Sequence, residues 1–168
     1  MVNIFLIGFM GSGKSTVASC LAETYGMEII EMDQLIVERE GMSIPDIFAQ
    51  KGEPYFRNAE TNLLIEMQAE ENKVVSCGGG VVLRERNVEE MKKSGKIILL
   101  NAKPETILER VKDDDNRPLL RGNKNVEFIS NMMEQRRPKY EGAADSVIQT
   151  DGKTTDMICK EIIEKVGE

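Results

Sequence analysis

The sequence feature that most constrains this chain is the stretch Gly8-Phe9-Met10-Gly11-Ser12-Gly13-Lys14-Ser15. It fits the pattern GxxxxGK followed by Ser or Thr, which is typical of a phosphate-binding loop. Mostly apolar residues 2–7 precede it and predict a short buried strand, and apolar residues at helical spacing follow it as far as Gly26. A strand, a glycine-rich loop and a helix in this order predict a nucleoside triphosphate site rather than a simple turn.

The chemistry of this loop follows from its residue types. Glycines let the backbone turn tightly, so that several N–H groups point at one anion, and the helix N-terminus adds partial positive charge. Lys14 is predicted to reach the β- and γ-phosphates, and the Ser15 hydroxyl is predicted to bind Mg²⁺.

Composition limits the classes of function. The length of 168 residues fits one domain, and the net charge of −7 argues against nucleic acid as the main partner. No apolar run reaches the ~20 residues of a membrane span, and residue 2 enters a strand directly, so we expect neither a membrane partner nor a signal peptide. The chain has no histidine, so a proton acceptor must be a carboxylate or a perturbed Lys, Cys or Tyr.

The cysteines bear on the compartment. Cys20, Cys77 and Cys159 are widely spaced and odd in number, and they match neither a disulfide framework nor a zinc pattern. We expect them to pack as small apolar side chains in a reducing compartment, and hence a cytoplasmic protein.

Short apolar runs predict the fold class. They lie at roughly 2–7, 27–32, 73–77, 96–101 and 145–150, and segments of helical character separate them. This alternation predicts an α/β fold with a parallel sheet and helices on both faces. Ligands of such sheets gather at the carboxyl ends of the strands, so the residues after each strand are the candidates for chemistry.

Two segments follow strands in this way. Asp33 stands at the end of the second predicted strand, and Gly78-Gly79-Gly80 come directly after the third. Adjacent glycines weaken a fold unless the backbone must approach something closely. A helix capped near Asn87, rather than an antiparallel strand, is predicted next, so we interpret the glycine run as a close approach to a ligand.

Charged residues in three further segments are ambiguous. Arg57 and Glu60 are three apart on a helix predicted from about 55 to 69, and their spacing alone favours a solvent-exposed ion pair of about 0.2–0.5 kcal/mol. The polar stretch 112–122 resembles a lid in which Arg117 reaches a triphosphate, or else is an ordinary surface loop. Arg136 lies in a basic cluster near a helix C-terminus, which helix-dipole electrostatics alone would explain.

Together these segments resemble the shikimate kinase family, in the nucleoside-monophosphate-kinase-like branch of P-loop proteins, over nearly the full length. The matching segments are residues 8–16, Asp33, residues 56–60, 78–80, 117–120 and 136–140. The resemblance implies one three-layer domain, 1–168, with a five-stranded parallel sheet of order 2-3-1-4-5. It also implies a lid at about 112–124, a small substrate-binding subdomain at about 33–60, and a monomer.

The implied activity is transfer of the γ-phosphoryl of ATP to the 3-hydroxyl of shikimate, in the route to chorismate and the aromatic amino acids. Asp33 would hold the substrate hydroxyls, and it is the leading candidate for the base because histidine is absent. Arg57 and Arg136 would bind the substrate carboxylate, and Gly78, Gly79 and Gly80 would lie against the ring. The implied ATP contacts are Gly11, Ser12, Gly13, Lys14, Ser15, Thr16, Arg110, Arg117 and Lys153, and the implied catalytic residues are Lys14, Asp33 and Arg117.

One position departs from the family pattern. Many members carry Asp-x-Asp where this chain has Glu31-Met32-Asp33. The first carboxylate is usually linked to Mg²⁺, often through water, and Glu31 is longer by one methylene. Glu31 is therefore a possible metal residue with altered geometry.

Two other functions remain open. A related P-loop kinase for gluconate, a nucleotide or another polyol would share the loop and the lid, but would not need Arg57 and Arg136 beside Asp33. A non-catalytic nucleotide-binding regulatory module is disfavoured, because Lys14, Ser15, Asp33 and Arg117 are all present.

Overall fold

A single parallel sheet organises the molecule. The computed structural model describes residues 2–9, 11–111 and 126–167. The strands in these residues are β1 (Asn3–Ile7), β2 (Glu28–Glu31), β3 (Lys73–Ser76), β4 (Gly95–Asn101) and β5 (Ser146–Gln149). All neighbouring strands are parallel, and their order is β2-β3-β1-β4-β5. This confirms the predicted fold class and strand order.

Helices connect the strands and cover both faces of the sheet. The α-helices are α1 (Lys14–Tyr25), α2 (Met32–Glu40), α3 (Ile44–Lys51), α4 (Glu53–Glu66), α5 (Glu85–Ser94), α6 (Pro104–Val111), α7 (Val126–Ala143) and α8 (Thr155–Val166). Two 3₁₀ turns, η1 (Met67–Ala69) and η2 (Val81–Leu83), precede β3 and α5. None of the described helices has the length and apolar character needed to span a lipid bilayer.

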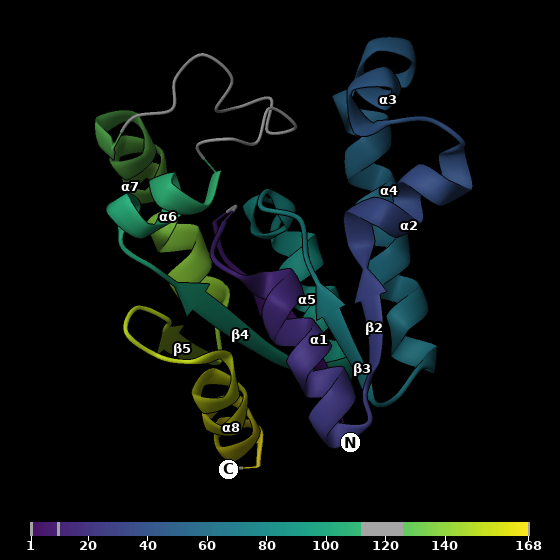
Figure 1. Ribbon diagram of the computed structural model, residues 1–168. Helices are drawn as coiled ribbons and strands as arrows, with labels where there is room; N and C mark the ends of the chain where they lie inside the picture. The colour runs from purple at the N-terminus through teal and green to yellow at the C-terminus, as the bar shows by residue number, and fades with distance from the viewer. Residues whose placement is uncertain (1, 10, 112–125, 168) are drawn as a thin grey trace.

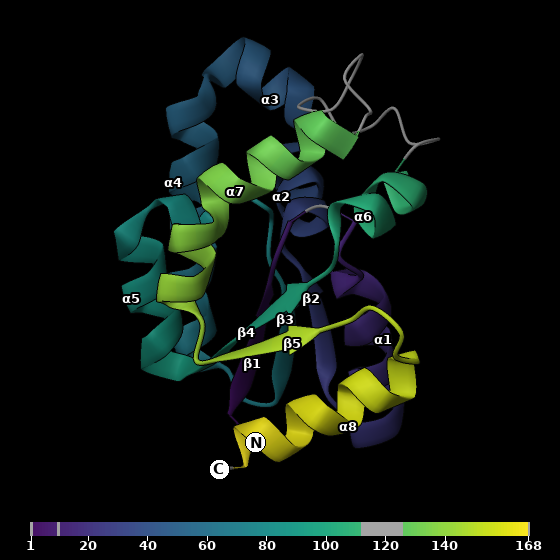
Figure 2. The ribbon, with the colours of Figure 1, turned by 90° about the vertical axis from the view of Figure 1, so that its left-hand side faces the viewer.

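The alternation of side chains along β1 explains the three layers. Ile4 and Leu6 point to one face and pack with residues of α1 and α8, whereas Phe5 and Ile7 point to the other and pack with residues of α4 and α5. Figure 2 shows the sheet between these two layers, with α1 and α8 on one side and α4, α5 and α7 on the other. Because both faces are buried, β1 is apolar at nearly every position.

Two groups of helices rise beyond the carboxyl ends of the strands. Helices α2, α3 and the first part of α4 stand on one side, α6 and α7 stand on the other, and the loop after β1 lies between them (Figure 1). Residues 33–60, the range predicted as a substrate-binding subdomain, make up most of the first group, and their role in binding stays a prediction. The predicted lid, 112–124, lies outside the described residues.

Two local predictions were wrong. Asp33 does not end a strand, because β2 stops at Glu31 and Asp33 lies in the first turn of α2. Asn87 does not cap a helix, because α5 already begins at Glu85. Its buried amide instead donates to the carbonyl oxygen of Val81 at 2.9 Å and accepts a hydrogen bond from the Thr61 hydroxyl at 2.6 Å.

Candidate active site

The loop between β1 and α1 has the backbone that its glycines predict. Gly8, Gly11 and Gly13 have φ angles of 150°, 79° and 96°, a region that other residues rarely adopt. A Cβ on Gly8 would lie 2.4 Å from the carbonyl oxygen of Leu100, so this glycine is also required for space. The loop therefore depends on glycine both for its backbone angles and for its packing against β4.

The N-terminus of α1 differs from those of α3 and α8. Ser43 and Thr154 cap α3 and α8 by accepting hydrogen bonds from backbone N–H groups at 3.3 and 3.2 Å. Gly13 stands at the same position of α1 and has no side chain to cap the helix. Gly13 therefore supplies no side-chain cap to α1, as expected of a helix whose N-terminus binds phosphate.

Among the described residues, Lys14 and Arg110 donate hydrogen bonds to this loop. The Lys14 ammonium donates to the carbonyl oxygens of Gly8 at 2.7 Å and Phe9 at 3.3 Å. The Arg110 guanidinium, from α6, donates to the carbonyl oxygen of Gly11 at 2.9 Å. Lys14 and Arg110 are thus both held against the loop, on the side of the adjoining cavity.

A cavity of about 570 Å³ joins this loop to the ends of β2 and β3. It is lined by Gly11, Gly13, Lys14, Ser15, Thr16, Glu31, Asp33, Gln34, Ser76, Cys77, Gly78, Gly79 and Arg110. Most of the residues predicted from sequence are in this lining, including the predicted metal residues Ser15 and Glu31. The thiol of Cys77 is not a nucleophile here, because burial raises its pKa.

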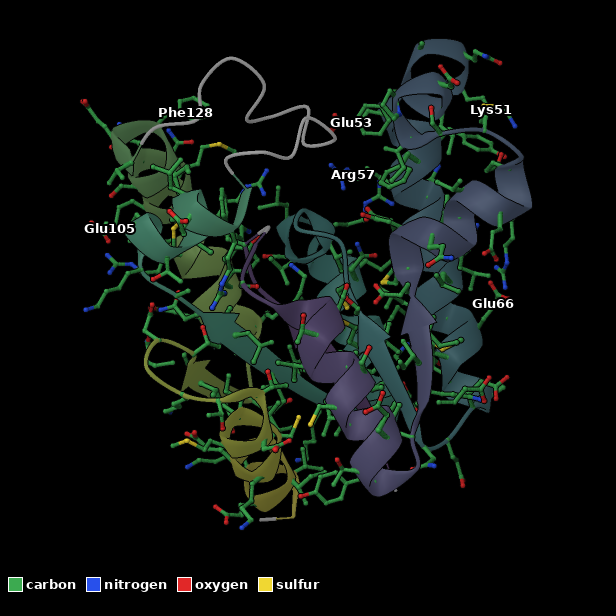
Figure 3. The ribbon with its side chains drawn as sticks, viewed as in Figure 1. Lys51, Glu53, Arg57, Glu66, Glu105 and Phe128 are labelled. Atoms are coloured by element: carbon green, nitrogen blue, oxygen red, sulfur yellow. The ribbon has the colours of Figure 1, made fainter. Side chains whose placement is uncertain are left out.

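Three predicted substrate residues converge on the glycine run. A Cβ added to Gly78 would lie 2.9 Å from an oxygen of Asp33, one on Gly79 would lie 3.4 Å from Arg136, and one on Gly80 would lie 2.8 Å from Arg57. Figure 3 shows Arg57 on the inner side of α4, facing the middle of the molecule, while Glu66 lies on the outer side. The glycines therefore leave room for site side chains that come from three different helices.

Tyr140 and Phe9 support Arg136. The buried Tyr140 hydroxyl donates to the carbonyl oxygen of Gly79 at 2.6 Å, and burial raises the pKa of this phenol while the positive charge of Arg136 lowers it. The Arg136 guanidinium also lies over the Phe9 ring, 5.9 Å from the ring centroid. These contacts link α7, the glycine run and the phosphate-binding loop.

Glu60 belongs to the site, and sequence reasoning missed it. The Arg57–Glu60 pair does form, at 2.9 Å, but Glu60 is only 1% exposed rather than on a solvated helix face. Burial raises the pKa of Glu60 from 4.5 to about 7, although the charge of Arg57 opposes this shift. The three-residue spacing indicated the pair, but only the packing of neighbouring elements buries it.

Among the described residues, the predicted ATP residues Ser12 and Lys153 are not part of the cavity lining. Lys153, after β5, forms an ion pair with Glu161 of α8 at 2.8 Å and is not part of the lining. Arg117 lies outside the described residues. The described residues contain no cluster of three or more His, Cys, Asp or Glu side chains that could hold a metal ion by themselves.

Comparison with known proteins identifies the family. A family model described as shikimate kinase matches residues 10–167. The chain belongs to the shikimate kinase family. It is 44% identical over 166 residues to a shikimate kinase from Sulfurihydrogenibium sp., covering 99% of this chain and 98% of that protein. A solved shikimate kinase from Acinetobacter baumannii in complex with shikimate has a TM-score of 0.89 at 34% identity, covering 98% of this chain and 92% of that one.

Family membership confirms the predicted activity, an ATP-dependent kinase that phosphorylates shikimate in aromatic biosynthesis. A gluconokinase from Sinorhizobium meliloti is more distant, with a TM-score of 0.62 and 18% identity over 99% of this chain and 91% of that one. That likeness shows the shared fold alone. The comparisons thus favour shikimate over gluconate, the first of the alternative acceptors.

Proposed function

We propose that the cavity holds ATP against the β1–α1 loop and shikimate against the glycine run, so that the γ-phosphoryl passes to the 3-hydroxyl of shikimate. The observation that carries this proposal is the convergence of Asp33, Arg57 and Arg136 on Gly78, Gly79 and Gly80. A hydroxylated ring with one carboxylate needs a carboxylate partner for its hydroxyls and cations for its acid group. This site offers both beside the phosphate-binding loop.

The two arginines fix the orientation of the acceptor. A planar carboxylate suits the paired donors of guanidinium better than the point charge of an ammonium. Arg57 and Arg136 approach the glycine run from α4 and α7, so they bind the carboxylate from two directions. The ring is then held with one hydroxyl toward Asp33, which orients it and accepts its proton as phosphorus is attacked.

The donor side supplies charge neutralisation. Phosphoryl transfer depends mainly on positioning and on stabilising charge on the phosphate oxygens. Lys14 exchanges its contacts with backbone carbonyls for the β- and γ-phosphates, and Arg110 lies at the rim of the same loop. Arg117 is proposed to meet the triphosphate, and Lys153 would contact ATP only after leaving its ion pair with Glu161.

The donor set of the cavity fits Mg²⁺. The Ser15 hydroxyl and the Glu31 carboxylate both line it, and Mg²⁺ prefers such oxygen ligands together with phosphate oxygens and water. Ser15 would bind the ion directly and Glu31 through water. When bound with ATP, Mg²⁺ neutralises phosphate charge.

We also expect a single cytoplasmic domain that acts as a monomer, with 33–60 as its substrate-binding subdomain.

An acceptor panel tests this proposal. ADP release is followed with shikimate, gluconate and nucleoside monophosphates as acceptors, and turnover is expected with shikimate alone. Turnover only with gluconate or a nucleotide would contradict the acceptor assignment, and no turnover with any of them would favour the regulatory module.

Asp33→Asn should lower kcat far more than it weakens ATP binding, and near-normal kcat in this variant would remove Asp33 as the base.

A further inference from the structure

Glu60 is a buried carboxylate that the proposed mechanism does not yet use. It lies on α4, one turn after Arg57, and its side chain is 1% exposed. One of its oxygens, Oε1, accepts a hydrogen bond from the Arg57 guanidinium at 2.9 Å. Arg57 thus lies between two acids, the buried Glu60 and the carboxylate that it is proposed to bind.

The second oxygen of Glu60 has a different environment. Oε2 is buried and accepts no hydrogen bond from any of the described residues. It faces the glycine run, since a Cβ on Gly78 would lie 3.2 Å from it and 2.9 Å from Oδ1 of Asp33. A buried carboxylate oxygen without a donor is costly when ionised, and protonation removes that cost.

The charges around Glu60 are nearly balanced. Among the described residues, the charged and titratable groups that act on it are Arg57 on its own helix, Asp33 from α2, Arg84 from the segment between η2 and α5, and the Cys77 thiol after β3. Arg57 and Arg84 favour the ionised form of Glu60, whereas burial and Asp33 favour the neutral form. The resulting pKa of about 7 leaves both forms populated near neutral pH.

A carboxylate bound to Arg57 disturbs this balance in one direction. It adds a negative charge beside Glu60, and it competes for the guanidinium donors that stabilise the ionised form. We propose that binding of the shikimate carboxylate to Arg57 is coupled to uptake of a proton by Glu60. The proton comes from solvent and forms an O–H bond on Oε2, the oxygen that Arg57 does not hold. This inference rests on the proposed role of Arg57.

The coupling predicts how affinity depends on pH. Below the pKa of free Glu60 the residue is protonated in both states, so shikimate affinity is highest and independent of this group. Above that pKa a proton must be taken up, and affinity falls by up to about tenfold per pH unit until the pKa of the bound state is reached. The pH range in which shikimate affinity falls therefore begins near pH 7 and extends upward.

Titration calorimetry measures the proton directly. Shikimate is titrated into the whole protein at pH 8 in buffers of different ionisation enthalpy, and the slope of observed enthalpy against ionisation enthalpy gives the protons taken up. We expect a slope of at least ~0.3 proton per shikimate for the wild type. Glu60→Gln should reduce the slope to zero and flatten the dependence of Kd on pH between 7 and 9.

A matched control separates Glu60 from other acids near Arg57. Glu53 also faces Arg57, at 3.8 Å, but it is exposed, so Glu53→Gln should keep the wild-type slope. A zero slope in the wild type, or an unchanged slope in Glu60→Gln, would overturn the coupling. A zero slope in the wild type overturns the coupling even where the Gln variant fails to fold.

An Arg57→Ala variant separates a failure of the proton coupling from a failure of the proposed function. If Arg57→Ala binds shikimate as tightly as the wild type, the proposed role of Arg57 is wrong and the coupling falls with it. If Arg57→Ala weakens binding but the wild type takes up no proton, only the coupling is wrong.

Discussion

The two halves of the site are built in different ways. The main part of the donor side is one continuous segment, the β1–α1 loop with Lys14, whose ammonium contacts carbonyls only five and six residues away. Arg110 is added to it from α6. The acceptor side is assembled from α2, α4, α7 and the segment after β3, which meet only in the folded molecule. A motif can therefore reveal the donor side by itself, whereas the acceptor side depends on packing.

The two sides also differ in how they carry charge. The donor side exposes backbone N–H groups and cations to an anion that brings its own negative charge. The acceptor side already contains an internal ion pair, Arg57–Glu60, with the carboxylate buried. Loss of the donor-side cation Lys14 should therefore affect catalysis, whereas changes to the acceptor-side arginines should affect binding and changes to Glu60 should respond to pH.

The largest expected effect is on the donor side. Lys14→Met should lower kcat by about 10³-fold, close to 4 kcal/mol, because a cation next to the transferred phosphoryl is lost. Steady-state kinetics with saturating shikimate measure this loss. Lys96→Met, an exposed change at the start of β4, is the control. A loss of less than tenfold in Lys14→Met would mean that Lys14 does not stabilise the transition state.

The next effect concerns the buried charge of the acceptor side. Because folding raises the pKa of Glu60 from 4.5 to about 7, its stabilising contribution is complete below pH 4.5 and is lost as pH rises through 7. Relative to Glu60→Gln, the wild type should lose up to ~3 kcal/mol of unfolding free energy across this window. Urea denaturation of both proteins between pH 4.5 and 7.5 measures the difference. A pH-independent difference would show that Glu60 is ionised throughout.

Removal of an arginine should affect binding more than catalysis. Arg136→Ala should raise KM for shikimate by about 10–100-fold, since a charge-assisted hydrogen bond contributes about 1.5–3 kcal/mol. The KM for ATP should change little. Arg137→Ala is the matched control, because this neighbour is exposed and pairs with Glu134. An unchanged shikimate KM in Arg136→Ala would leave helix-dipole electrostatics as the explanation of the basic cluster.

The smallest expected effect tests the glycine run. A Cβ at Gly80 would lie 2.8 and 3.0 Å from the two terminal nitrogens of Arg57, so Gly80→Ala should displace the guanidinium without unfolding the protein. We expect shikimate KM to rise about tenfold, or ~1.4 kcal/mol, and the melting temperature to change little. Gly142→Ala in α7 is the control, because a Cβ there meets nothing within 4 Å. An unchanged KM in Gly80→Ala would mean that Arg57 tolerates the methyl group.

Local patterns predicted much of this molecule. The apolar runs predicted the strand bounds to within one residue, because a strand buried on both faces, such as β1, is a nearly continuous apolar run. Ser43 caps α3 by a local rule, since its hydroxyl accepts a hydrogen bond from the backbone N–H three residues on. Asn87 follows the same local rule but is buried, and its partners are Thr61 and Val81. A rule based on near neighbours fails where distant segments supply the hydrogen bonds.

The sequence by itself determined the phosphate-binding loop, the alternation of strands and helices, and the family resemblance. These depend on backbone sterics and on side-chain periodicity within short segments. Only the tertiary structure decided that the glycines at 78–80 make room for Asp33, Arg136 and Arg57, and that Glu60 is buried. The dielectric environment of a carboxylate depends on which elements pack around it. Spacing along the chain could therefore pair Glu60 with Arg57, but could not predict its pKa.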